Sequence, residues 1–320
     1  MIPRIRIAHL PTLIEPLPRL SAVLGGPRLW VKRDDQTGLA LGGNKVRKLE
    51  YVLAEAQANG AKTLVTVGAA QSNHCRQTAA LAARFGLGCI LVLSGDSKGK
   101  PDGNLLLDHL FGAEIQWAPQ VNREAILKEA FDRAWNEGRR PFLIPLGAST
   151  PIGTIGYVTA FEEFLKQGID VDWIIVASSS AGTQAGLVLG ARRAGWGGKI
   201  LGINIDHPVN ILQPRVANLA NEASARLGEN VRVSADDILV NGDYLGAGYG
   251  ILNRNEIEAI HLFAETEGLV LDPVYTCRAA AAMIDLIRKG YFTPKERVLF
   301  WHTGGIPALF SEKYANLLTE

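Results

Sequence analysis

From about residue 28 onward, short apolar runs alternate with longer stretches in which apolar residues recur at helical spacing. The apolar runs predict strands at 29–31, 63–67, 89–93, 114–117, 142–144, 173–177, 199–205 and 298–301. The stretches between them predict helices at 46–56, after 72, and at 104–111, 123–136, 151–167, 183–194, 210–227, 255–267, 276–289 and from 307. Apolar strands separated by helices are typical of parallel sheets covered on both faces. We therefore expect an α/β protein that binds ligands at the carboxyl ends of its strands.

Two parts of the chain depart from this alternation. Residues 1–28 are rich in proline, and we expect residues 11–20 to form a surface arm; residues 241–250 are irregular. A chain of 320 residues has the length of about two domains. Because it contains no internal repeat or long linker, we expect the second domain to be inserted in the first.

The composition excludes several classes of function. With 33 basic and 32 acidic residues, the net charge of +1 indicates binding to neither nucleic acid nor an anionic membrane. The three cysteines, Cys75, Cys89 and Cys277, have neither the spacing of a zinc site nor the even number of a disulfide framework. No apolar run is long enough for a signal peptide or a membrane span. We expect a soluble cytoplasmic protein.

Lys45 is the first candidate for chemistry. It follows a turn at 42–44, whose two glycines let the backbone pass close to a bulky group, and it opens a predicted helix. The helix N-terminus and the cations Arg47 and Lys48 are expected to lower the pKa of its amine. A neutral amine of this kind attacks carbonyl groups.

Two other interpretations of Lys45 compete with this one. Taken on its own, the lysine fits better as a solvated surface residue, and only companion motifs favour a chemical role. Gly38 and Gly43 have the spacing of a Walker phosphate loop, but Asn44 intervenes before Lys45 and Val46 replaces the magnesium-binding hydroxyl residue. We therefore reject the phosphate loop.

Two strand ends favour the binding of anions. In the segment 68–74, Ser72 or Asn73 can cap the next helix, whose first amides form an anion site. In the segment 178–186, small residues allow amides to surround a phosphate, and Ser180 and Thr183 add hydroxyl donors. The dinucleotide fingerprint G-x-G-x-x-G is absent there, so a single phosphate is favoured. An empty capping loop and simple helix-to-sheet packing are the alternatives.

Three further strand ends carry aromatic or hydroxyl residues. Tyr249 lies in the glycine-rich loop 246–250, and Tyr275 follows the Asp272-Pro273 turn. Thr303, within His302-Thr-Gly-Gly305, can contact the edge of a flat heteroaromatic ring. A flexible turn and a buried core tyrosine are the alternatives. His302 lacks companions at metal-ligand spacing, so we predict a structural histidine and no metal site.

Taken in order, these motifs resemble the fold type II pyridoxal phosphate enzymes of the tryptophan synthase β family. Within that family the chain resembles the branch of 1-aminocyclopropane-1-carboxylate deaminase and D-cysteine desulfhydrase. The resemblance extends over almost the whole chain, through L-P-R-L (17–20), K-R-D-D (32–35), G-G-N-K-V-R-K-L-E (42–50), Q-S-N-H (71–74), S-A-G-T-Q-A-G (180–186), L-D-P-V-Y-T (271–276) and H-T-G-G (302–305).

The resemblance implies an architecture and a cofactor. The expected fold is two open, mostly parallel twisted sheets with helices on both faces, and the cofactor is pyridoxal 5'-phosphate. A large domain would comprise residues 1–45 and 155–320, and a small inserted domain residues 46–154. The resemblance also implies a homodimer.

It further implies a role for each matching residue. Lys45, Ser72 and Tyr275 would be catalytic, with Lys45 binding the cofactor covalently and removing the α-proton of the substrate. Asn73 would bond to the ring hydroxyl, Tyr275 would stack near the ring, and Thr276 and Thr303 would lie beside the ring. The phosphate would be held by Ser180, Ala181, Gly182 and Thr183. The substrate would contact Ser72, Asn73, His74, Tyr249 and Tyr275.

Thr276 and Thr303 distinguish reactions within the branch. Deaminases that open the cyclopropane ring resemble one another in having a glutamate at the first position and lacking threonine at the second. A hydroxyl would leave the pyridine nitrogen largely neutral, which gives a weaker electron sink. Such a sink suffices where a thiolate leaves the β-carbon, so D-cysteine is expected to give pyruvate, hydrogen sulfide and ammonia by α,β-elimination.

Other activities remain open from the sequence. Ser179 replaces a glycine that is common in relatives, which leaves the amide pattern of the phosphate loop undetermined. The segments 30–35 and 71–77 also resemble L-cysteate sulfo-lyase. Aminocyclopropane carboxylate and D-serine are further candidate substrates. A non-catalytic protein that carries pyridoxal phosphate or binds amino acids is the alternative from another class.

Overall fold

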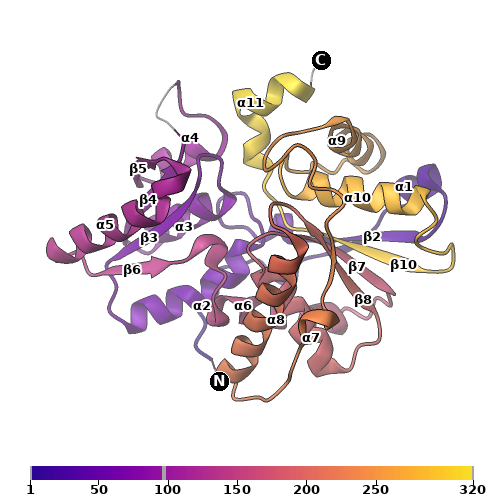
Figure 1. Ribbon diagram of the computed structural model, residues 1–320, viewed down its shortest axis with the longest axis horizontal. Helices are drawn as coiled ribbons and strands as arrows, with labels where there is room; N and C mark the ends of the chain where they lie inside the picture. Colours follow the sequence, from indigo (N-terminus) through magenta and orange to yellow (C-terminus); the bar gives the residue numbers. More distant parts are fainter. Residues whose placement is uncertain (1, 96–98, 319–320) are drawn as a thin grey trace.

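The computed structural model describes residues 2–95 and 99–318, and these form two sheets (Figure 1). The larger sheet has the strand order β1-β2-β10-β7-β8-β9, so the last strand of the chain lies between the second and the seventh. Its strands are β1 (Ile14–Pro16), β2 (Arg28–Arg33), β10 (Arg297–His302), β7 (Trp173–Ser178), β8 (Lys199–Asn204) and β9 (Leu239–Asn241). Only β1 runs antiparallel to its neighbour.

Helices cover both faces of the larger sheet. Apolar residues of α6 (Pro151–Lys166) and α7 (Gly182–Ala194) pack on one face, around Trp301 and Leu299. On the other face lie α1 (Pro18–Leu24), α9 (Arg254–Glu267) and α10 (Thr276–Arg288). The central strands are buried from both sides, which explains why their sequences are apolar throughout.

The smaller sheet is parallel, with the order β5-β4-β3-β6. Its strands are β5 (Glu114–Ala118), β4 (Gly88–Ser94), β3 (Thr63–Ala69) and β6 (Pro141–Ile144). The helix α5 (Arg123–Asn136) covers one face, and α2 (Lys45–Ala58) and α3 (Asn73–Arg84) pack on the other. The short helix α4 (Gly103–Leu110) lies beside α3. The predicted fold class is confirmed.

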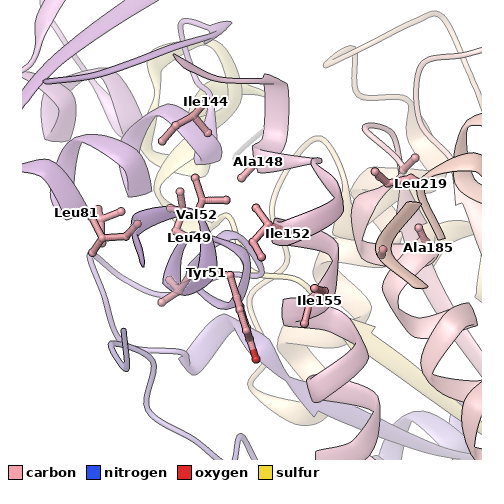
Figure 2. Packing of buried hydrophobic residues seen from close by; sticks show 14 of the residues in the cluster. Leu49, Tyr51, Val52, Leu81, Ile144, Ala148, Ile152, Ile155, Ala185 and Leu219 are labelled. Atoms are coloured by element: carbon pink, nitrogen blue, oxygen red, sulfur yellow. The ribbon is translucent and has the colours of Figure 1, made fainter. Parts of the chain in front are cut away.

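An apolar cluster joins the smaller sheet to α6, α7 and α8, the helices that follow it in the chain. Figure 2 shows Leu49 and Val52 of α2 facing Ile152 and Ile155 of α6, with Leu219 of α8 (Val209–Arg226) nearby. The predicted domain boundary at 45/46 lies at the start of α2, and the one at 154/155 lies inside α6. Because both helices pack in this shared cluster, the division of the chain into two domains remains a proposal.

The prediction of a surface arm at residues 11–20 is wrong. This segment contains β1 and the start of α1, and Leu17 and Leu20 are buried. Its prolines have local structural reasons, because Pro16 ends an edge strand and Pro18 occupies the first turn of a helix. The helix predicted from residue 307 is instead a 3-10 turn, Ile306–Phe310, followed by the short α11 (Glu312–Ala315). Within residues 2–95 and 99–318, no helix is long and apolar enough to cross a membrane.

Candidate active site

A cavity of about 270 Å³ lies where the carboxyl ends of the two sheets approach each other. It is lined by many residues predicted from the sequence: Lys45, Ser72, Asn73, His74, Ser180, Ala181, Thr183, Tyr249, Tyr275 and Thr303. Gly182 and Thr276, which were also predicted, are not on its wall. The lining residues come from segments between Asn44 and Gly304. Motifs that are far apart in the sequence therefore meet at one site.

Lys45 opens α2 and is partly exposed on the cavity wall, while residues 42–44 and 46–53 are buried. The turn before it requires glycine. A β-carbon on Gly42 would lie 1.9 Å from the carbonyl oxygen of Asp35, and one on Gly43 would lie 2.5 Å from Nε2 of Gln77. The ammonium of Lys45 donates to Oδ1 of Asn44 at 3.2 Å. The turn therefore fixes where the amine enters the cavity.

Burial lowers the pKa of Lys45 to about 8, although the nearby carboxylate of Asp272 opposes the shift. The direction agrees with the sequence argument, but the cause differs. Arg47 does not act as a free cation, because its guanidinium pairs with Asp34 and Glu163. At neutral pH about a tenth of the Lys45 amines would be unprotonated, far more than for an exposed lysine.

Ser72 and His74 set the start of α3. The hydroxyl of Ser72 accepts a hydrogen bond from the amide of Cys75 at 3.2 Å and caps the helix. The ring of His74 donates through Nε2 to the hydroxyl of Thr66, which itself donates to the carbonyl of Ile144 at 2.6 Å. Burial lowers the pKa of His74, so its ring is neutral. At this helix start the backbone amides, rather than a charged histidine, are therefore the groups suited to bind an anion.

The start of α7 combines several donors. Ala181 precedes the helix with a φ of 71° and cannot cap it with its methyl side chain; the amide of Gly182 donates to the hydroxyl of Ser149 at 3.3 Å. The hydroxyls of Ser180 and Ser149 lie 2.8 Å apart beside it. A β-carbon on Gly182 would approach Nζ of Lys48 to 2.8 Å, so the lysine reaches this turn. Free amides, two hydroxyls and an ammonium in one place suit a phosphate group.

Lys48 strengthens this match. Its side chain is buried, and among the described residues it contacts only neutral oxygens: the carbonyl of Gly147 at 3.3 Å and the hydroxyl of Ser149 at 3.1 Å. Burial, together with Lys45, holds the pKa of Lys48 well below its usual value. A bound anion would supply the missing counter-charge. Sequence reasoning assigned no ligand to Lys48, although its position three residues after Lys45 places both on one helix face.

Tyr249 and Tyr275 face each other across the cavity wall. Their hydroxyl oxygens are 2.6 Å apart, and their rings meet edge to face at 5.9 Å between centroids. Burial raises the pKa of Tyr249 to about 12 and raises that of Tyr275 as well. Both phenols are therefore neutral at neutral pH, and either hydroxyl can donate the hydrogen bond between them.

Thr276 is hydrogen-bonded to Asp272 at the start of α10. Its hydroxyl donates to Oδ1 of Asp272 at 2.7 Å, and Asp272 also accepts the amides of residues 274–276. Thr276 thus stabilises the start of α10, and its place beside the cofactor ring stays a prediction. Thr303 does line the cavity, and its carbonyl accepts the amide of Asn44 at 3.0 Å. His302 is buried and bonds to the carbonyl of Val270, which fits a structural histidine.

The outer part of the cavity contains residues that the sequence did not single out. Arg123 at the start of α5 donates to the hydroxyl of Ser94 at 3.4 Å, and within the described chain its buried Nε has no partner. On the opposite wall, Ser179 donates to Asp206 at 2.8 Å. No motif marked Arg123, because a single arginine at a helix start resembles many solvated ones. In the described residues, no group of three or more His, Cys, Asp or Glu is placed to bind a metal.

A lysine on a glycine turn, an anion site at one helix start and a second anion site at another define a pyridoxal phosphate enzyme. The chain belongs to the family of pyridoxal-phosphate dependent enzymes, and the model of that family matches residues 5–304. It is 40% identical to D-cysteine desulfhydrase from Klebsiella pneumoniae (strain 342) over 318 residues, which is 97% of this chain and 96% of the relative.

Solved structures agree with this assignment. A crystal structure of an ACC deaminase homologue superposes with a TM-score of 0.91 at 37% identity, covering 99% of this chain and 96% of the other. A fungal L-serine ammonia-lyase from Rhizomucor miehei superposes with a TM-score of 0.71 at 17% identity, covering 98% and 99%. The second likeness is one of fold alone. The predicted family, fold type and cofactor are confirmed.

Proposed function

We propose that this protein removes the β-substituent of a small amino acid by α,β-elimination, and that D-cysteine is its first substrate, giving pyruvate, hydrogen sulfide and ammonia. The observation that carries the proposal is Lys45, whose lowered pKa and position on the cavity wall suit both cofactor attachment and proton removal. Identity of 40% with a D-cysteine desulfhydrase over nearly the full length supports the choice of substrate.

The residues present would divide the work as follows. The start of α7, with Ser180, Thr183 and Lys48, would hold the phosphate of the cofactor. The start of α3 would hold the substrate carboxylate. When bound, pyridoxal phosphate supplies an electron sink for the negative charge that develops at the α-carbon.

Lys45 would remove the proton from the α-carbon of the substrate once its amine is no longer bonded to the cofactor. Tyr275, in contact with Tyr249, would then donate a hydrogen bond to the departing sulfur. Its raised pKa keeps the phenol neutral and able to donate. With the cofactor bound, the cavity of about 270 Å³ would leave space for only a small amino acid.

A second candidate reaction is the release of sulfite from L-cysteate. Arg123 favours it, because a guanidinium with an unpartnered nitrogen faces the outer cavity and could bind a sulfonate. Opening of aminocyclopropane carboxylate is less well supported, since no carboxylate occupies position 276.

We further propose that the protein acts in the cytoplasm as a homodimer. Size-exclusion chromatography with light scattering tests the dimer.

The experiment is a panel of D- and L-alanines with thiol, sulfonate, hydroxyl or chloride at the β-carbon, plus aminocyclopropane carboxylate. Release of pyruvate, or of a keto acid, is measured for the protein and for Lys45→Ala. The proposal expects pyruvate from D-cysteine and at least a roughly thousandfold loss in Lys45→Ala. Visible cofactor absorbance without turnover of any substrate would instead favour a non-catalytic carrier.

A further inference from the structure

The side chain of Asn73 is held by a chain of hydrogen bonds that begins at the surface. Asn104, the second residue of α4, is completely buried, and its Nδ2 donates to Oδ1 of Asn73 at 2.8 Å. Asn73 lines the cavity and is the residue proposed to bond to the ring hydroxyl of the cofactor. Its own donor, Nδ2, bonds to no acceptor among the described residues and lies beside Gly305, where a β-carbon would approach it to 2.5 Å.

The orientation of each side-chain amide in this chain of hydrogen bonds is fixed by neighbouring groups that can only accept or only donate. Nδ2 of Asn104 also donates to the main-chain carbonyl of Gln71 at 3.0 Å, and a carbonyl cannot donate. The amide of Asn104 therefore has one orientation, with its NH₂ group toward Asn73. Asn73 must therefore accept this hydrogen bond through Oδ1, and its own NH₂ group faces the cavity.

Gln71 is fixed in the same manner. Its Nε2 donates to the carboxylate of Asp102 at 2.7 Å, and its Oε1 accepts the amide of Asn104 at 2.8 Å. The other oxygen of Asp102 accepts the amide of Glu312 at 2.6 Å, a residue near the end of the chain. The network thus runs from α11 through Asp102, Gln71 and Asn104 to the cavity.

Gly103 allows these groups to approach. Its φ is +50°, and a β-carbon there would lie 2.4 Å from Oε1 of Gln71 and 2.9 Å from the carbonyl oxygen of Pro307. No side chain fits between α4, the loop before α3 and the 3-10 turn near the C-terminus. The turn 102–104 is therefore constrained from three sides.

We propose that Asn104 is a positioning residue: it orients Asn73 so that a hydrogen-bond donor, rather than an acceptor, meets the phenolic oxygen of pyridoxal phosphate. The inference rests on the proposed function, because it assigns Asn73 to that oxygen. A donor at this place stabilises the deprotonated oxygen and lowers its pKa, whereas an acceptor would have the opposite effect. Asn104 contacts neither cofactor nor substrate in this scheme and acts through Asn73.

The test is the isosteric substitution Asn104→Asp in the holoenzyme. A carboxylate offers only acceptors, so Asn73 should rotate and turn its oxygen toward the cofactor. We expect the pH midpoint of the visible cofactor absorbance to move upward by about one unit or more. Cofactor affinity should fall by roughly 10- to 100-fold, with kcat reduced more than KM changes.

Three variants separate orientation from simple damage to the fold. Leu106→Gln changes an exposed residue on the same helix and should titrate like the unchanged protein. Asn73→Ala removes the group through which Asn104 acts, so adding Asn104→Asp to it should produce no further shift of the midpoint. Asp102→Asn alters the same chain nearer the surface and should produce a smaller shift in the same direction, which keeps the test decisive if Asn104→Asp does not fold.

The outcomes are distinguishable. An unchanged midpoint in both Asn104→Asp and Asp102→Asn would overturn the positioning role while leaving the proposed function intact. A further shift in the double variant would show that Asn104 acts by another route and would also overturn it. If the unchanged protein takes up no pyridoxal phosphate, the proposed function itself fails.

Discussion

Arg47 and Lys48 are neighbours on the same helix, yet they belong to two regions with opposite electrostatic character. Arg47 lies in a buried ion network with Lys32, Asp34 and Glu163, in which Arg47 bonds to Asp34 at 2.8 Å and to Glu163 at 2.9 Å. Tyr157 and Trp301 also donate to Asp34, at 2.6 and 2.8 Å. Every charge in this network is matched by another.

The cavity differs in that several of its polar groups lack a charged or hydrogen-bonding partner. Lys48 has only neutral oxygens around it, and within the described residues the hydroxyl of Ser178 and Nε of Arg123 have none. Unpartnered buried groups are unfavourable in the absence of a ligand. The comparison teaches that the paired charges hold the fold, while the unpaired ones are complementary to a ligand.

The largest effect is expected from a substitution that disrupts the buried ion network. Asp34→Asn leaves Arg47 buried without its main counter-charge, so the free energy of unfolding should fall by about 3–5 kcal/mol, measured by urea denaturation at neutral pH. Burial alone would raise the pKa of Asp34, but Arg47 outweighs it and lowers the pKa to about 2. The contribution of Asp34 is therefore present above about pH 4 and is lost toward pH 2, where the two proteins should converge.

An exposed ion pair provides the control for this experiment. Arg288 pairs with Glu258 at 2.6 Å with both side chains about half exposed. Glu258→Gln should change the free energy of unfolding by less than about 1 kcal/mol. Equal losses in the two variants would contradict the structural importance given to the buried network.

Lys48→Met sharpens the contrast by replacing an unpaired buried charge with an apolar chain of similar length. The apoprotein should be as stable as before or more stable, because an uncompensated charge is removed. Affinity for pyridoxal phosphate should fall by roughly 10- to 100-fold, since charge-assisted bonds to the phosphate are lost. Fluorescence or absorbance titration measures the affinity, and Lys128→Met, at an exposed site, is the control. A destabilised apoprotein with normal affinity would contradict this interpretation.

The pH dependence of cofactor capture tests Lys45. Only the neutral amine attacks a carbonyl, and the pKa of Lys45 is lowered to about 8 by burial. The rate at which the apoprotein takes up pyridoxal phosphate should therefore rise up to about tenfold per unit below pH 8 and level off above it. Stopped-flow absorbance gives the rate. A continued rise toward pH 10 would mean that Lys45 keeps the pKa of an ordinary lysine.

The smallest effect concerns Arg123. Arg123→Gln should lower kcat/KM for L-cysteate by about two- to fivefold relative to D-cysteine, because the guanidinium is partly exposed and its attraction to a sulfonate is screened. Competition between the two substrates in one assay measures the ratio. No change in that ratio would remove Arg123 from substrate selection.

The sequence was most informative where one physical requirement acts locally. Apolar strands between helices predicted both sheets, and the glycine turn before Lys45 predicted the start of α2. It was least informative where a role depends on packing. The edge strand β1 was mistaken for an arm because its prolines also suit loops. The hydrogen bond from the hydroxyl of Thr276 to Asp272 is a contact that no spacing rule contains. Lys48 differs from a solvated lysine only in being covered by residues from distant elements.

The central position of β10 has a consequence for how the chain folds during synthesis. The smaller sheet needs only residues 63–144, whereas β2 must wait for β10, which ends at residue 302, before it gains its parallel neighbour. Until then, β2 and β7 each present an unpaired edge. We expect nascent chains halted near residue 290 to show a protease-resistant smaller sheet and a sensitive larger one. The cavity between them would then be completed only after β10 has left the ribosome.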